Sequence, residues 1–155
     1  MSSLAANDQA KASGSGTHSE TVIFFDIGGT LASARVSTAG SLLGLDADPA
    51  VFPVLERLRT RQFRMGIISN PPASVPADSM RTALTDCGLY EFFDPGLLVY
   101  SSTIPSTDPN SGKEIKPKPD PSIFRYAAGL AGAEAECVFV GEDARERAGA
   151  LSAEM

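Results

Sequence analysis

The sequence has no tryptophan, one histidine and only two cysteines in 155 residues. Two cysteines are too few for a disulfide framework, and they would leave a zinc site without its other soft ligands. Cys87 and Cys137 each lie in an apolar pattern, which is typical of small core residues in a reducing compartment. We therefore expect a cytoplasmic protein. The histidine, His18, lies in the amino-terminal segment and is expected to have no role.

Basic residues are also scarce, and long apolar runs are missing. Lysine and arginine number 13 against 19 acidic residues, which gives a formal net charge of -6. An acidic protein has no broad attraction for nucleic acids or anionic membranes, so neither is expected as a partner. No segment approaches the roughly 20 apolar residues of a transmembrane helix. The first residues also lack the hydrophobic stretch of a signal peptide.

The chain divides into a short polar segment and one domain. Residues 1–20 are rich in serine, alanine and glycine, and we expect a disordered tail or linker there. Residues 21–155 are enough for one domain with a single core. In this part, strand-like apolar segments alternate with helical patterns, which indicates βαβ units. The fold class expected is α/β, a Rossmann-like three-layer sandwich with a mainly parallel sheet.

Four strands and four helices are predicted. The strands cover residues 22–25, 63–68, 96–100 and 137–140, and the segment 101–118 between the last two is a polar loop. The first helix opens at Asp48-Pro49 with Asp48 as N-cap, and the second covers 77–87. The third runs from Pro121 to Gly132, and the last starts near Ala144. The residues of the third helix expected to face inward are Ile123, Phe124, Ala127 and Leu130. A doubly wound sheet usually continues with another strand. The domain is therefore either one that lacks its last edge strand or a fragment of a longer chain.

The first predicted strand ends abruptly at a lone carboxylate, Asp26. In an open α/β sheet, ligands bind at the carboxyl ends of the strands. A carboxylate there can act as a nucleophile that takes up a phosphoryl group. Gly28, Gly29 and Thr30 follow at once, and glycines allow main-chain N–H groups to approach an anion closely.

Polar side chains also follow the other predicted strands or precede a helix: Ser69 and Asn70, then Lys118, then Glu142, Asp143 and Glu146. Parallel strands would bring all of these groups to one edge of the sheet. Carboxylates that share a site repel each other unless a cation lies between them, and oxygen ligands suit magnesium. A serine hydroxyl and a lysine can hold the charge of a phosphoryl group. Lys113 and Lys116 compete with Lys118, which is favoured because it directly precedes a helix start.

Taken in order, these residues resemble the four motifs of the haloacid dehalogenase superfamily, most of whose members are magnesium-dependent phosphohydrolases. The motifs read Asp26-Ile27-Gly28-Gly29-Thr30, Ser69, Lys118 and Gly141-Glu142-Asp143 with Glu146. The resemblance covers about residue 21 to the carboxyl terminus. It implies catalytic roles for Asp26 and Lys118, phosphate binding by Ser69, Asn70, Gly29, Thr30 and Lys118, and magnesium binding by Asp26, the Gly28 carbonyl, Glu142, Asp143 and Glu146.

The first motif departs from the family pattern at Gly28, where the family has a second aspartate. In similar phosphatases this aspartate protonates the leaving group and then activates water, and acid–base catalysis of this kind contributes about 10²–10⁴-fold. Glycine can do neither, although its carbonyl can still ligate a metal. Two functions stay open. One is a slow magnesium-dependent phosphohydrolase or phosphotransferase that acts through an aspartyl phosphate. The other is an inactive domain that serves as a binding or scaffolding module.

Relatives with other residues at this position perform different reactions. Haloacid dehalogenases have an aromatic residue there and need no metal, which the acidic fourth motif disfavours. Phosphonoacetaldehyde hydrolases have a small residue and use a lysine from a cap domain, but the short interval from Leu31 to Phe63 has no room for a helical cap. We therefore expect a minimal cap and an open site for a phosphorylated substrate of unknown identity. Further partners would be copies of the same chain or other domains of a longer one.

Overall fold

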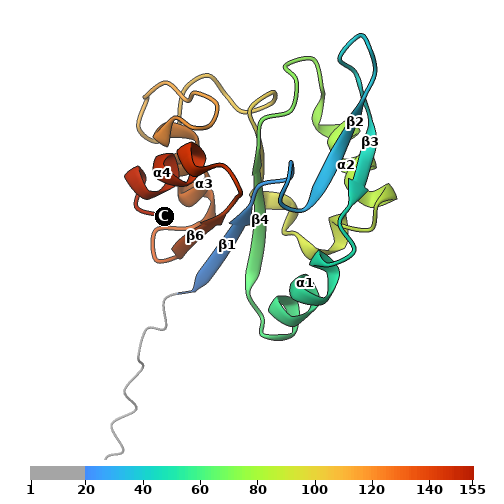
Figure 1. Cartoon of the computed structure of the whole chain (residues 1–155). Helices are drawn as coiled ribbons and strands as arrows, with labels where there is room; N and C mark the ends of the chain where they lie inside the picture. The colour runs from blue at the N-terminus through green and yellow to red at the C-terminus, as the bar shows by residue number, and fades with distance from the viewer. Residues whose placement is uncertain (1–19) are drawn as a thin grey trace, which may run out of the picture.

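The computed structural model describes residues 20–155, so all of the predicted tail except Glu20 lies outside the described residues. Its centre is a four-stranded sheet in the order β5-β4-β1-β6 (Figure 1). The strands are β1 (Thr21–Phe25), β4 (Arg64–Ser69), β5 (Leu98–Tyr100) and β6 (Glu136–Val140). All three pairings between them are parallel, which confirms the predicted α/β class.

Helices cover both faces of this sheet, which gives the predicted three layers (Figure 1). On one face lie α1 (Val51–Thr60) and α2 (Ala77–Asp86), and on the other lie α3 (Pro121–Ala131) and α4 (Ala144–Ser152). The strands are buried from both sides, as is usual for parallel sheets. In β1, Phe25 joins the core beneath α1 and α2, whereas Val22 and Phe24 join the core beneath α3 and α4. Every helix of the described region is too short or too polar to cross a membrane.

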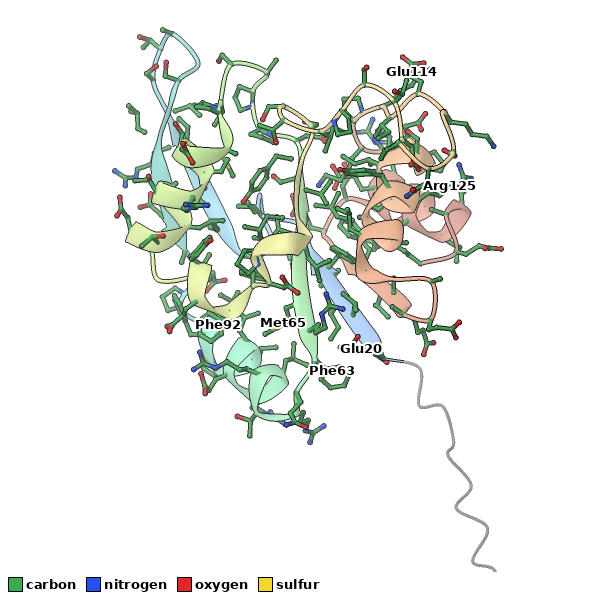
Figure 2. All side chains as sticks on the ribbon, turned by 180° about the vertical axis from the view of Figure 1, so that it is seen from behind. Glu20, Phe63, Met65, Phe92, Glu114 and Arg125 are labelled. Carbon is green, nitrogen blue, oxygen red and sulfur yellow. The ribbon has the colours of Figure 1, made fainter. Side chains whose placement is uncertain are left out.

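Aromatic side chains fill one end of the core that lies beneath α1 and α2. Two short 3₁₀ helices, η1 (Tyr90–Phe92) and η2 (Pro95–Leu97), precede β5. Phe92 packs 6.1 Å from the ring of Phe52, and Phe93 meets Phe25 edge to face at 6.1 Å. Figure 2 shows Phe92 and Met65 at the end of the molecule opposite Glu114. Packing around Phe92 therefore occupies the end at which β1 begins, and the carboxyl end of the sheet is left for a site.

The sequence did not predict the antiparallel hairpin of β2 (Ala32–Val36) and β3 (Leu42–Ala47). Most residues of β2 are exposed, so it has no apolar run that would identify a strand. The Ser37 N–H donates to the Ser41 carbonyl at 2.8 Å and closes the turn. β3 packs against α2, and the hairpin projects beside that helix at the carboxyl end of the sheet (Figure 1).

The third predicted strand, 96–100, is shorter than expected, because residues 96–97 belong to η2 and β5 begins at Leu98.

Two further local predictions were wrong. α1 begins at Val51 after an Ala50 N-cap, not at Pro49. The Asp48 carboxylate instead accepts the Ala50 N–H at 2.9 Å and closes a turn just before the helix. Leu130 is exposed, and Ala131 takes the inward position. The buried face of α3 follows Ile123, Phe124, Ala127 and Ala131, and Leu130 lies beside this stripe.

Gly149 allows α4 to approach the loop before α3 very closely. A Cβ atom at this position would lie 2.0 Å from the Pro119 carbonyl oxygen. Since that oxygen belongs to the main chain, the two segments would have to separate. We expect Gly149→Ala to lower the free energy of unfolding by about 1–3 kcal/mol, the usual cost of overpacking.

Gly129→Ala is the matched control, because Gly129 lies in α3 and a Cβ atom added there would have no atom within 4 Å. Replacing a glycine inside a helix by alanine is favourable by roughly 0.5–1 kcal/mol. Denaturant unfolding of both variants measures the difference. Equal stabilities would show that the close approach at Gly149 is not a constraint.

Arg64 links the start of β4 to the segment before β5, because its Nη2 atom lies 2.9 Å from the Asp94 carboxylate. The hydrogen bond from this guanidinium, helped by the Gly96 N–H, lowers the pKa of Asp94. A lowered folded-state pKa stabilises the protein above the unfolded pKa of about 4, and the contribution is lost as the pH falls through the folded value. We expect Asp94→Asn to be less stable than the parent at pH 7, and this difference to become smaller at pH 3, below the unfolded pKa. Thermal unfolding at both pH values tests this, with the exposed Glu91→Gln as control.

Candidate active site

The carboxyl edge of the sheet holds a cavity of about 370 Å³. Its lining includes eight of the predicted site residues: Asp26, Gly28, Ser69, Asn70, Lys118, Glu142, Asp143 and Glu146. They come from the ends of β1, β4 and β6, from the loop before α3 and from the start of α4. The convergence that the sequence predicts is therefore present. Gly29 and Thr30 are not part of the lining.

Lys118 is the centre of this site. Its ammonium lies 2.5 Å from Oδ1 of Asp26 and 2.8 Å from Oε2 of Glu146, and its side chain is 1 % exposed. The Phe139 ring adds a cation–π contact at 5.5 Å. An unpaired buried ammonium would be very costly, and two carboxylates with good hydrogen-bond geometry offset this cost. Lys116 and Lys113, the competing candidates, are exposed.

Asn70 fixes the main chain of Lys118. Its Nδ2 donates to the Lys118 carbonyl at 2.9 Å, and its Oδ1 accepts the Lys118 N–H at 3.1 Å. The pair joins the end of β4 to a residue 48 positions later in the chain. Asn70 therefore positions the lysine, and its direct contact with a phosphate stays a prediction. No sequence pattern indicates this pairing.

The turn after Asp26 is tight. Gly29 has a φ of 70°, a conformation that glycine adopts without strain, and its N–H donates to the Ala32 carbonyl at 3.2 Å. The Thr30 N–H donates to the Ile27 carbonyl at 3.1 Å. Both N–H groups donate to main-chain carbonyls and close the turn. Phosphate binding by Gly29 and Thr30 stays a prediction. Gly28, by contrast, faces open space, because a Cβ atom added there would have no atom within 4 Å.

The three acids after β6 have different surroundings. Asp143 is the N-cap of α4, and the N–H and guanidinium of Arg145, together with the Glu146 N–H, lower its pKa. Glu146 is paired with Lys118. The Glu142 carboxylate leans over Gly29, where an added Cβ atom would lie too close to its oxygens to fit. Among the described residues, none donates a hydrogen bond to the Glu142 carboxylate.

The oxygen atoms of the cavity bear on the expected magnesium site. Within residues 20–155, no three histidine, cysteine or acidic side chains form a metal-binding group. Mg²⁺, however, is usually held by one or two carboxylates, with water and substrate phosphate as further ligands. Asp26, Gly28 and Glu142 all line the cavity, and their two carboxylates and one main-chain carbonyl are donors of that kind. The residues present fit magnesium, with Asp143 and Glu146 engaged in other contacts.

The apolar residues that line the cavity were not predicted as site residues from the sequence. Ala34, Val36, Leu42 and Leu45 of the hairpin line it together with Met80 of α2. Since the hairpin itself was not predicted, these residues could not be assigned to the site.

No protein-family description matches the chain, and no curated protein matches it. The chain is similar in fold to solved structures that include the following two. A HAD-superfamily hydrolase from Ehrlichia chaffeensis superposes with a TM-score of 0.62 at 15% identity, over 87% of this chain and 84% of that one. The fold is of the haloacid dehalogenase type. An uncharacterized protein from Listeria monocytogenes serotype 4b gives a TM-score of 0.57 at 24% identity, over 79% of this chain and 67% of that one.

We expect Lys118→Met to destabilise this domain strongly. Removing the ammonium leaves two carboxylates facing each other in a buried place, and breaking a buried ion pair typically costs about 3–5 kcal/mol. Lys116→Met is the matched control, because that lysine is exposed and its change should cost no more than about 0.5 kcal/mol. Urea unfolding of the two variants measures this. Similar midpoints would show that the buried lysine does not hold the site together.

Proposed function

We propose that the protein is a slow, magnesium-dependent phosphohydrolase or phosphotransferase that acts through an aspartyl phosphate. The observation that supports this most is the position of Asp26. Its Oδ1 is held by Lys118 at the carboxyl end of β1, in a cavity that also contains Ser69. A carboxylate oriented in this way can attack the phosphorus atom of a substrate in the same cavity.

Each residue has a role in this proposal. The hydrogen bond from Lys118 to Oδ1 of Asp26 orients the carboxylate and leaves Oδ2 to attack. Lys118 and the Ser69 hydroxyl balance the negative charge on the phosphoryl group in the transition state. Glu146 keeps the lysine in place, and Asn70 fixes its main chain. After the leaving group departs, water hydrolyses the aspartyl phosphate and restores the carboxylate.

The charges of the cavity support the magnesium requirement. Four carboxyl groups and one ammonium line it, so a phosphate dianion would meet net negative charge. Asp26, the Gly28 carbonyl and Glu142 would hold the ion, with Asp143 and Glu146 as the less available candidates. When bound, magnesium would supply the positive charge that lets Asp26 and the phosphate approach each other.

Gly28 favours a second candidate function. A domain without the acid at this position can bind a phosphorylated partner without turning it over, as a binding or scaffolding module. In either case we propose a cytoplasmic protein, which the two free cysteines support. Assembly with further copies or domains would supply a fuller cap.

Asp26→Asn tests the proposed function. We expect the parent to hydrolyse 4-nitrophenyl phosphate in the presence of Mg²⁺ and to bind beryllium fluoride at Asp26, and the variant to do neither. Initial rates with and without Mg²⁺ and ¹⁹F NMR of the beryllium fluoride complex are the measurements. Asp46→Asn serves as control, because Asp46 is an exposed residue of β3 that pairs with Arg35 and does not line the cavity. Retained turnover in Asp26→Asn would exclude the aspartyl phosphate.

A further inference from the structure

The cavity has two chemically different sides. Asp26, Lys118 and Glu146 form a charged side at the sheet. The hairpin contributes the apolar side chains of Ala34, Val36, Leu42 and Leu45 to the same cavity, and Met80 and Pro71 add to this apolar wall. None of these wall side chains can donate or accept a conventional hydrogen bond. An apolar wall beside a charged centre is suited to a ligand with one phosphorylated end and one apolar end.

The wall disfavours polyhydroxylated substrates. Hydroxyl groups of a sugar phosphate placed against Leu42 and Leu45, the less exposed residues of the hairpin wall, would lose hydrogen bonds to water without replacement, which is costly. The Asn70 carboxamide, a neutral polar group with two hydrogen-bonding ends, is already bound to the Lys118 main chain at both. The cavity of about 370 Å³ is also near the lower limit of small-molecule sites, so the organic group is small.

The cavity also limits the leaving group. Among the described residues, its lining contains no histidine, cysteine or tyrosine. Its four carboxyl groups have other tasks in the proposed function, because Asp26 attacks, Glu142 binds magnesium, Asp143 caps α4 and Glu146 pairs with Lys118. Gly28 has no side chain, and the Lys118 ammonium is already bound by two carboxylates. An alkoxide, which must be protonated as it departs, would receive little help here. A leaving group that is stable as an anion needs no such acid.

From these two independent features we infer that the substrate is a small aryl phosphate, with its ring against the hairpin wall. This inference rests on the proposed function. An Asp26 carboxylate oxygen forms a bond to phosphorus while the phosphorus–oxygen bond to the aryl group breaks. The electron pair of that bond leaves on the aryloxide, which then takes a proton from water. A water molecule hydrolyses the aspartyl phosphate, which releases inorganic phosphate and regenerates Asp26.

The first experiment varies the leaving group. We expect kcat/KM of the parent, measured with Mg²⁺, to fall steeply from 4-nitrophenyl to phenyl to 4-methoxyphenyl phosphate, and glucose 6-phosphate to be turned over least. Gly28→Asp, which meets no neighbouring atom at its Cβ, should flatten this dependence by speeding the poorer leaving groups by about 10²-fold or more. A parent that hydrolyses glucose 6-phosphate as fast as phenyl phosphate would overturn the inference.

The second experiment tests the wall. Val36 is 52% exposed, so Val36→Ser should leave the fold intact while lowering kcat/KM for phenyl phosphate about tenfold. Acetyl phosphate, whose leaving group is also a stable anion but has no ring, should be unaffected. Leu43→Ser is the control, because Leu43 is exposed on the same hairpin but does not line the cavity.

The outcomes separate this inference from the proposed function. If Val36→Ser and Leu43→Ser behave alike toward phenyl phosphate, the wall does not bind the ring and the inference fails. If acetyl phosphate is turned over through Asp26 but aryl phosphates are not, the proposed function stands and the inference fails. If no phosphate ester or acyl phosphate is hydrolysed in a manner that depends on Asp26, both are wrong.

Discussion

The buried ammonium of Lys118 is the interaction on which the site depends. A lysine with 1 % side-chain exposure needs opposite charge on more than one side, and Asp26 and Glu146 provide it from two different elements. The Lys118 ammonium therefore connects the loop before α3 to the end of β1 and to the first turn of α4. The same contacts that stabilise this junction also orient the Asp26 carboxylate toward the cavity.

The acids around this junction have different tasks because their partners differ. Asp143 caps the N-terminus of α4 and Glu146 pairs with Lys118, whereas Glu142 does neither and leans over Gly29. A cluster of three carboxylates that looks uniform in the sequence is thus divided into a helix cap, a lysine partner and a candidate metal ligand. Gly141, at which a Cβ atom would meet the Phe139 ring at 2.8 Å, lets the chain turn tightly from β6 into this cluster.

The main features of the fold could be read from the sequence because the two central strands of the sheet, β1 and β4, end at or directly before a polar residue. Apolar runs that stop at Asp26 and Ser69 indicate both the strands and the edge at which they end. The hairpin could not be predicted, because its first strand is exposed and its stability comes from packing of β3 on α2. The Asn70–Lys118 pairing was equally hidden, since it joins residues 48 positions apart by hydrogen bonds to the main chain. Local signals also misplaced the start of α1, where Asp48 closes a turn before the helix begins.

The two hydrogen bonds from Asn70 to the main chain of Lys118 affect where the sequence can change without disturbing the site. Because the lysine is anchored from β4 at both its N–H and its carbonyl, its position does not depend on the path of the preceding segment, residues 101–117. Most of that segment is exposed and contains no strand or helix of its own. Changes of length or sequence at its exposed residues 109–114 would therefore cost little at the candidate site, whereas Ile115 is held in the core.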